Sequence, residues 1–138
     1  MDSQLMTDTV HSRSIGMPGR ALNSARAQHF ILDSSSGPSE ALTNSEAFLA
    51  GISSCGVTLI EKYARETRAA MTSLEVMIAG ARSKSDPAHF HSIEMRFDVH
   101  GVGQQEADHL VGIWRSRRPL YLTVAVATEV KIEVVAHT

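Results

Sequence analysis

The chain contains one cysteine, Cys55, and thiol chemistry is the first possibility that its residues raise. A single cysteine can form neither an internal disulfide nor a zinc site built from several cysteines. Cys55 is therefore either a small buried hydrophobic residue or a reactive thiol. A reactive thiol would act as its thiolate, which is a nucleophile and the form that peroxides oxidise.

Two histidines have a spacing that could chelate a metal ion. His89 and His91 lie two residues apart, so on a strand they would point to the same side. His100 falls on the opposite face, and no third ligand is evident. We interpret these histidines as surface residues, and we expect no metal site and no cofactor.

The element that must position Cys55 is a long helix. Thr43 and Glu46 form the pattern Thr-x-x-Glu, a capping box in which each side chain accepts a free backbone N–H group at a helix start. Apolar residues then recur at three- and four-residue spacing along one stripe: Phe48, Ile52, Cys55 and Leu59. The pattern predicts a buried helix that begins near Thr43 and ends near residues 66–68.

Shorter elements precede and follow this helix. Residues before 24 are broken by glycine and proline into pieces that could pair as a hairpin. Periods of two and of 3.6 predict strands at 27–33, 74–80, 92–100 and 129–134, with a second helix at 104–117 that Pro119 ends. The order predicts an α+β fold with a largely antiparallel sheet, in one domain over residues 1–138, of which 1–8 are expected to be disordered.

Composition excludes several classes of function. The net charge of −2 and the 5% of aromatic residues give no basis for binding nucleic acid. No apolar run approaches the ~20 residues that a membrane span needs, and the first ten residues lack the pattern of a signal peptide. We therefore expect a cytoplasmic protein with neither nucleic acid nor membrane as a partner.

The long helix is apolar over more than half of its circumference. In a chain of 138 residues whose other expected helix is short, a second surface must cover it. We expect a homodimer to supply that surface.

Two short motifs and the order of elements resemble a known family. The motifs are the block SEAFLAG at residues 45–51, followed by Ser53-Ser54-Cys55, and Arg118-Pro119-Leu120 after the second helix. Over about residues 29–134 the chain resembles the OsmC/Ohr family of organic hydroperoxide reductases and osmotically induced proteins. The resemblance implies an intertwined α+β homodimer with largely antiparallel sheets around the long helix and with sites at the dimer interface.

The resemblance also implies roles for individual residues. Cys55 matches the cysteine that attacks the peroxide, and Glu46 matches the acidic residue that helps to position a catalytic arginine. Arg118 stands where the family has its second, resolving cysteine. No arginine lies in residues 34–45, and Arg26 is the nearest upstream candidate for the arginine that orients the peroxide.

Two of these residues have alternative roles. Arg118 could lie near Cys55 and favour its thiolate, or it could belong with Arg115 and Arg117 to the basic last turn of a helix. Glu46 could serve only as a helix cap. Nine residues at 100° each place it on the opposite helix face from Cys55, roughly 13 Å away along the axis, so it could act only through another group or on the cysteine of a second copy.

Two functions remain open from the sequence. In the first, the protein is a peroxidase that reduces an organic hydroperoxide through Cys55 alone, with a small or protein thiol as the external reductant. In the second, it is a non-enzymatic relative that binds a small apolar or anionic ligand at the dimer interface, and Cys55 only packs.

Overall fold

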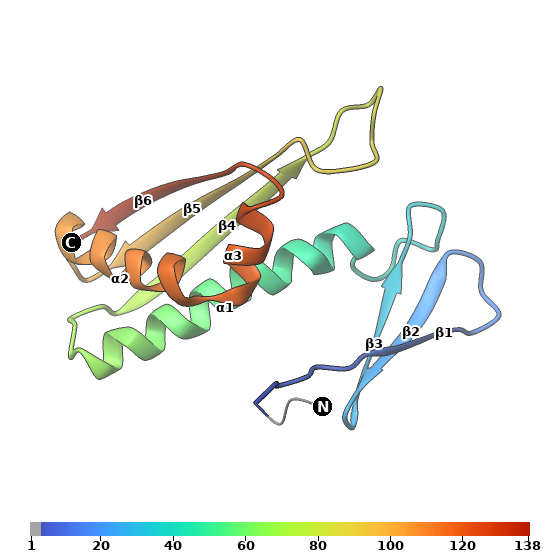
Figure 1. Ribbon diagram of the computed structural model, residues 1–138, viewed down its shortest axis with the longest axis horizontal. Coiled ribbons are helices and arrows are strands. Elements are labelled where there is room, and N and C mark those ends of the chain that lie inside the picture. Colours follow the sequence, from blue (N-terminus) through green and yellow to red (C-terminus); the bar gives the residue numbers. More distant parts are fainter. Residues whose placement is uncertain (1–3) are drawn as a thin grey trace. The chain divides into compact units, whose positions relative to one another are not determined.

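The computed structural model describes residues 4–138, and the chain divides into two compact units, Met1–Phe48 and Leu49–Thr138. The disorder expected for residues 1–8 falls partly on residues 1–3, which lie outside the described residues. Residues 5–10 have no regular secondary structure. Each unit has a three-stranded sheet of its own (Figure 1).

The first unit is an antiparallel meander in the order β1-β2-β3. Its strands are β1 (His11–Ser14), β2 (Arg20–Ala25) and β3 (Gln28–Asp33). The expected hairpin before residue 24 is confirmed as β1 and β2, and the expected strand at 27–33 is confirmed as β3. Arg26, at the tight turn between β2 and β3, has a positive φ of 57°.

A buried ion pair holds the first unit together. Asp33 is 0% exposed, and its carboxylate accepts hydrogen bonds from Arg20 Nε at 2.7 Å and from Arg20 Nη2 at 2.9 Å. The same carboxylate accepts the backbone N–H groups of Glu40 and Ala41, at 2.9 and 3.0 Å. The Arg20 guanidinium lowers the pKa of Asp33 far below its usual range, with a further contribution from the two N–H groups. Asp33 thereby fastens the loop after β3 to the sheet.

Helix α1 (Asn44–Glu66) follows that loop and continues into the second unit. Its buried residues are Ile52, Gly56, Ile60, Tyr63 and Ala64. The core-facing stripe is therefore rotated from the predicted one: Ile52 is buried, Cys55 and Leu59 are only partly buried, and Phe48 is 47% exposed. The predicted helix is confirmed, with its end at Glu66.

The sheet of the second unit has the order β4-β5-β6. Strands β4 (Ser73–Ala81) and β5 (Ser92–His100) are antiparallel, whereas β6 (Val130–His137) pairs with β5 in parallel. Parallel neighbours need a crossover connection, and α2 (Gln104–Arg117) and α3 (Pro119–Ala125) supply it. The sequence pattern does not predict helix α3. Pro119 ends α2 as predicted, but it also occupies the first turn of a new helix, where its missing N–H group costs nothing.

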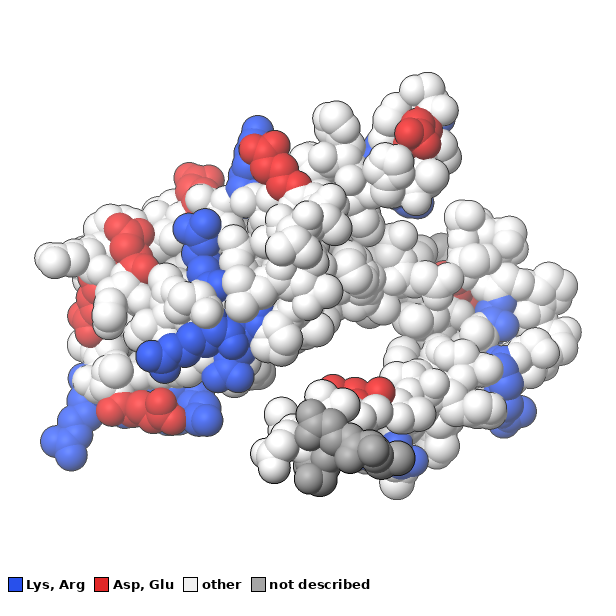
Figure 2. Space-filling view, in the orientation of Figure 1, with Lys and Arg blue, Asp and Glu red and all other residues white. Residues whose placement is uncertain are grey.

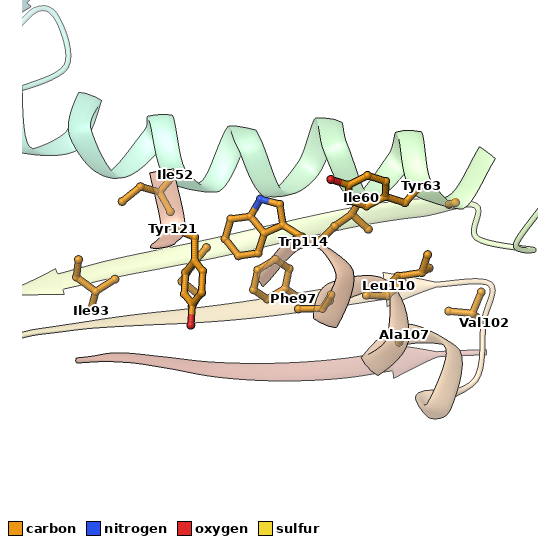
Figure 3. Packing of buried hydrophobic residues seen from close by; sticks show 14 residues of the cluster. Ile52, Ile60, Tyr63, Ile93, Phe97, Val102, Ala107, Leu110, Trp114 and Tyr121 are labelled. Atoms are coloured by element: carbon orange, nitrogen blue, oxygen red, sulfur yellow. The ribbon is translucent and has the colours of Figure 1, made fainter. Parts of the chain in front are cut away.

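The hydrophobic core lies between one face of this sheet and the helices (Figures 1 and 3). Strand β5 contributes every second residue to it, because alternate side chains of a strand point to opposite faces. The β5 members are Ile93, Met95, Phe97 and Val99, all at most 2% exposed. The predicted alternation of β5 is confirmed, while β6 extends to His137, past the end predicted for it at residue 134.

Surface charge is mixed. On the face seen in Figure 2, acidic and basic side chains are interspersed, in keeping with the small net charge of −2. Among residues 4–138, no helix has the length and apolar character that crossing a membrane would require.

We predict that Asp33→Asn lowers the melting temperature by several degrees near neutral pH. The variant leaves the Arg20 guanidinium without its carboxylate in a buried setting. Glu40→Gln is the matched control, because the Glu40 side chain is 71% exposed and lies 3.5 Å from Arg20. Thermal melts followed by circular dichroism compare the three proteins, and equal melting temperatures would refute the prediction.

We also predict that the difference in melting temperature between wild type and Asp33→Asn depends on pH. The folded-state pKa of Asp33 lies below its unfolded value, so its stabilisation is complete above the unfolded pKa of about 3.9 and is lost as the pH falls toward the folded value. The difference in melting temperature between wild type and Asp33→Asn should be constant near neutral pH and narrow below about pH 4. A difference that does not change in acid would contradict the assignment.

Candidate functional site

Cys55 lies beside the buried stripe of α1 and is partly exposed. Its neighbour Gly56 is buried, while Ser54 on its other side is exposed. The thiol is therefore neither sealed in the core nor fully open to solvent. It packs against the margin of the core cluster.

The hydrogen-bond partner of the thiol is Trp114 on α2. The indole Nε1–H donates to Cys55 Sγ at a nitrogen–sulfur distance of 3.4 Å, although the two residues are 59 positions apart. Trp114 is 0% exposed, and in Figure 3 its ring nitrogen faces α1. Trp114 is thus a core residue whose one polar atom reaches the candidate nucleophile.

Two aromatic rings and a glycine hold Trp114 in place. Its ring centroid lies 5.5 Å from that of Phe97 and 5.2 Å from that of Tyr121, in tilted arrangements typical of aromatic pairs. A Cβ atom added to Gly56 would lie 3.3 Å from Phe97 Cε1 and 3.8 Å from Trp114 Cε2. Glycine at this position lets α1 approach both rings.

Arg118 lies between α2 and α3 and bonds to a tyrosine. Its Nε donates to Tyr63 Oη at 2.6 Å, and its guanidinium carbon lies 5.4 Å from the centre of the Tyr63 ring. Tyr63 belongs to α1 but follows Cys55 by eight residues, about 12 Å along the helix axis. Within the described part of the chain, no hydrogen bond joins Arg118 to Cys55. An effect of its charge on the thiol stays a prediction.

A second arginine repeats this arrangement. Arg115 Nη2 donates to Tyr121 Oη at 3.5 Å, and the guanidinium carbon lies 5.9 Å from the centre of that ring. Arginine–aromatic contacts of this kind are favourable because the ring face carries partial negative charge. The end of α2 therefore places two guanidinium groups on aromatic residues near Trp114.

Glu46 forms the predicted capping box. Its backbone N–H donates to Thr43 Oγ1 at 3.1 Å, and its carboxylate accepts the backbone N–H of Thr43 at 2.9 Å. Both halves of the pattern are thus formed, and they belong to the start of α1. A further chemical role for Glu46 stays a prediction.

The histidines do not gather into a metal site. Among residues 4–138, no group of three or more histidine, cysteine, aspartate or glutamate side chains could hold a metal ion. His89 lies 3.9 Å from the Asp86 carboxylate, and both side chains are exposed. His100 stacks on His137 with ring centroids 4.5 Å apart.

A shallow hollow on the sheet of the second unit lies away from the thiol. A shallow cavity of about 360 Å³ lies on the sheet and includes Met77, Ala79, Arg96 and Lys131 in its lining. None of its lining residues belongs to the group around Cys55, so this cavity does not bear on thiol chemistry.

No protein-family model matches the sequence, and a search of curated proteins also finds no match. Solved structures do match. An OsmC-like protein from Mycoplasma pneumoniae is 13% identical and has a TM-score of 0.85, with 96% of this chain and 99% of that chain covered. The organic hydroperoxide resistance protein OsmC from Legionella pneumophila is 16% identical and has a TM-score of 0.68, covering 99% and 100%. The organic hydroperoxide resistance protein OhrB of Bacillus subtilis is 15% identical and has a TM-score of 0.63, covering 95% and 98%.

The chain therefore has the α+β fold of OsmC-like and Ohr proteins. The resemblance drawn from the sequence is confirmed at the level of the fold, over nearly the whole chain. The homodimer that the resemblance also implied stays a prediction.

We predict that Thr43→Ala lowers the free energy of unfolding by about 1 kcal/mol, because α1 loses the side chain that caps its first turn. Glu46→Gln should remain within about 0.5 kcal/mol of wild type, because glutamine also serves in a capping box. Urea unfolding measures both, and an unchanged Thr43→Ala would contradict the capping role. Loss of any peroxide activity in Glu46→Gln, with stability intact, would show that the carboxylate acts beyond the cap.

Proposed function

We propose that this protein is a thiol-dependent peroxidase that reduces an organic hydroperoxide at Cys55 and takes its electrons from an external thiol. One observation carries the proposal: the only thiol of the chain is partly exposed and accepts a hydrogen bond from a buried indole N–H group. The fold adds support, since two of the similar structures are named organic hydroperoxide resistance proteins.

The reaction needs one cysteine and one hydroperoxide in its first step. The Cys55 thiolate attacks a peroxide oxygen, so that a sulfur–oxygen bond forms while the oxygen–oxygen bond breaks. Sulfur is oxidised by two electrons to the sulfenic acid, and the departing alkoxide takes a proton to become the alcohol.

The second step depends on a reductant from outside the chain, because there is no second cysteine. An external thiol attacks the sulfenic sulfur, water leaves, and a mixed disulfide forms. A second external thiol then attacks the sulfur of the first, which releases a disulfide and restores the Cys55 thiolate. A small thiol or a thiol protein could serve as the reductant.

Positive charge near the end of α2 would favour the Cys55 thiolate, which the attack on the peroxide requires. Cys55 lies in the middle of α1, where the helix dipole contributes little to its thiolate. The guanidinium of Arg118 is held against Tyr63 of the same helix and is the candidate for long-range stabilisation of the anionic sulfur. In this proposal Cys55 is the nucleophile and Arg118 supplies charge.

We further propose that the active form is a homodimer. In the described part of the first unit the only buried residues are Asn23 and Asp33, and the unit buries no apolar side chain. Small sheets need an apolar face against a partner to be stable. The large apolar side chains left exposed in the described part of this unit are Leu5, Met6, Val10, Ile15, Met17, Phe30, Ile31, Leu42 and Phe48.

The second unit offers surface of the same character. Leu120 and Leu122 of α3 are 47% and 43% exposed, and Val126 is 89% exposed. Exposed apolar side chains on both units suit association of two copies of one chain. A second copy would also bring another Glu46, the one way in which that carboxylate could approach a Cys55.

We predict that the wild-type protein consumes cumene hydroperoxide catalytically when dithiothreitol is present. When it is absent, consumption should stop at a stoichiometric amount: one equivalent per chain for the sulfenic acid and a second where that is overoxidised to the sulfinic acid. Cys55→Ser should abolish both reactions because serine supplies no thiolate. Ser54→Ala is the matched control, since Ser54 is the exposed neighbour on the same helix and should leave the rate unchanged. Consumption that persists in Cys55→Ser would refute the proposal and favour a ligand-binding role.

We predict that the protein sediments at about twice its chain mass of 15.0 kDa. Phe30→Glu should weaken the dimer, because it puts a charge where apolar contact is required. Gln28→Glu, an exposed position on the same strand, should not. Analytical ultracentrifugation over a range of concentrations tests this, and a wild-type monomer throughout would contradict it.

A further inference from the structure

The indole N–H of Trp114 is a buried donor with an unusual acceptor. Tryptophan can only donate through this group, and Trp114 is 0% exposed, so water does not satisfy it. Its acceptor among the described residues is Cys55 Sγ, at 3.4 Å. A buried donor without an acceptor is costly, so the contact favours conformations in which the sulfur points at the indole.

The strength of this bond depends on the charge of the sulfur. A thiol is a weak acceptor, whereas hydrogen bonds to an ionised acceptor are roughly twice as strong as neutral ones. A donor that binds the anion better than the neutral thiol favours the anion. The hydrogen bond from the indole is therefore strongest to the thiolate, which is the form that reacts.

The donor is also rigidly placed. Phe97 and Tyr121 lie against the ring at centroid distances of 5.5 and 5.2 Å, and Gly56 allows α1 to come close. A donor fixed in this way need not reorganise when the sulfur becomes charged.

Other groups packed around the indole do not bind the sulfur. Of the titratable and charged side chains on the neighbouring helices, Tyr63 and Tyr121 belong to the core cluster, and Arg115 and Arg118 bond to them. Each arginine donates to a tyrosine, and β5 presents Phe97 and Met95 on this side. The indole N–H is the one hydrogen-bond donor to the sulfur within residues 4–138.

We propose that Trp114 is a positioning residue for Cys55, whose indole N–H orients the sulfur and favours its thiolate. This inference rests on the proposed function for its biological meaning. It does not rest on it for its test, because thiol reactivity can be measured without a peroxide.

The test is the rate at which iodoacetamide alkylates Cys55 at pH values on both sides of the ordinary thiol pKa of about 8.5. Trp114→Phe keeps an aromatic ring but removes the donor. Below that pH its rate should fall roughly 3- to 10-fold, the effect of losing one hydrogen bond, and its pH profile should move to higher pH.

Tyr121→Phe is the matched control. It keeps the ring that packs on Trp114 and the indole N–H, and it removes only the hydroxyl group that accepts a hydrogen bond from Arg115, so its pH profile should coincide with that of wild type. Superimposable profiles for Trp114→Phe and wild type would overturn the inference, and so would an equal shift in Tyr121→Phe.

A second measurement covers the case in which Trp114→Phe does not fold. Trp114 is the only tryptophan, so its fluorescence in the wild-type protein reports on the sulfur beside it. The emission should change over the same pH range as the alkylation rate, and this change should vanish in Cys55→Ser. A wild-type emission that is constant across that range would overturn the inference. Failure to consume cumene hydroperoxide, with both thiol results as expected, would count only against the peroxidase.

Discussion

The close approach of α1 to the sheet depends on glycine at position 56, which has no Cβ atom. At Gly56 a Cβ atom would lie 3.3 Å from Phe97, closer than packed side chains usually allow. Because the position is glycine, α1 can lie against the Phe97 and Trp114 rings, and the residue before it is carried to the indole N–H. The core of the second unit and the environment of the thiol therefore share one packing constraint.

Different interactions stabilise the two units. The second surrounds β5 with apolar side chains from three helices, as expected for a unit with enough chain to bury a core. Residues 4–48 of the first unit form no such core, and the most buried group among them is the carboxylate of Asp33, which accepts four hydrogen bonds. An ion pair of this kind fixes geometry more than it adds net stability, so the apolar side chains of that unit still call for a partner surface.

Local chemistry made much of the fold predictable. The capping box at Thr43 and Glu46 and the alternation of β5 are patterns within single elements, and both appear as expected. The pattern does not predict α3, because a proline after a helical stretch indicates a helix end, although proline is equally suited to a first helical turn. The contacts of the site lie beyond such patterns. A helical period shows that Cys55 and Trp114 face inward, but it does not determine how far α1 slides along α2, and that offset decides which donor meets the sulfur.

The span of 59 residues between Cys55 and Trp114 has a consequence for how the thiol behaves when the molecule fluctuates. Its surroundings exist only while α2 is docked on α1. Whenever α2 detaches, Cys55 loses its native contacts and becomes an ordinary solvated cysteine. The reactivity of its thiol therefore reports local opening of the structure. A slow labelling reaction on it would sample the free energy of undocking α2, as amide exchange samples the opening of backbone hydrogen bonds.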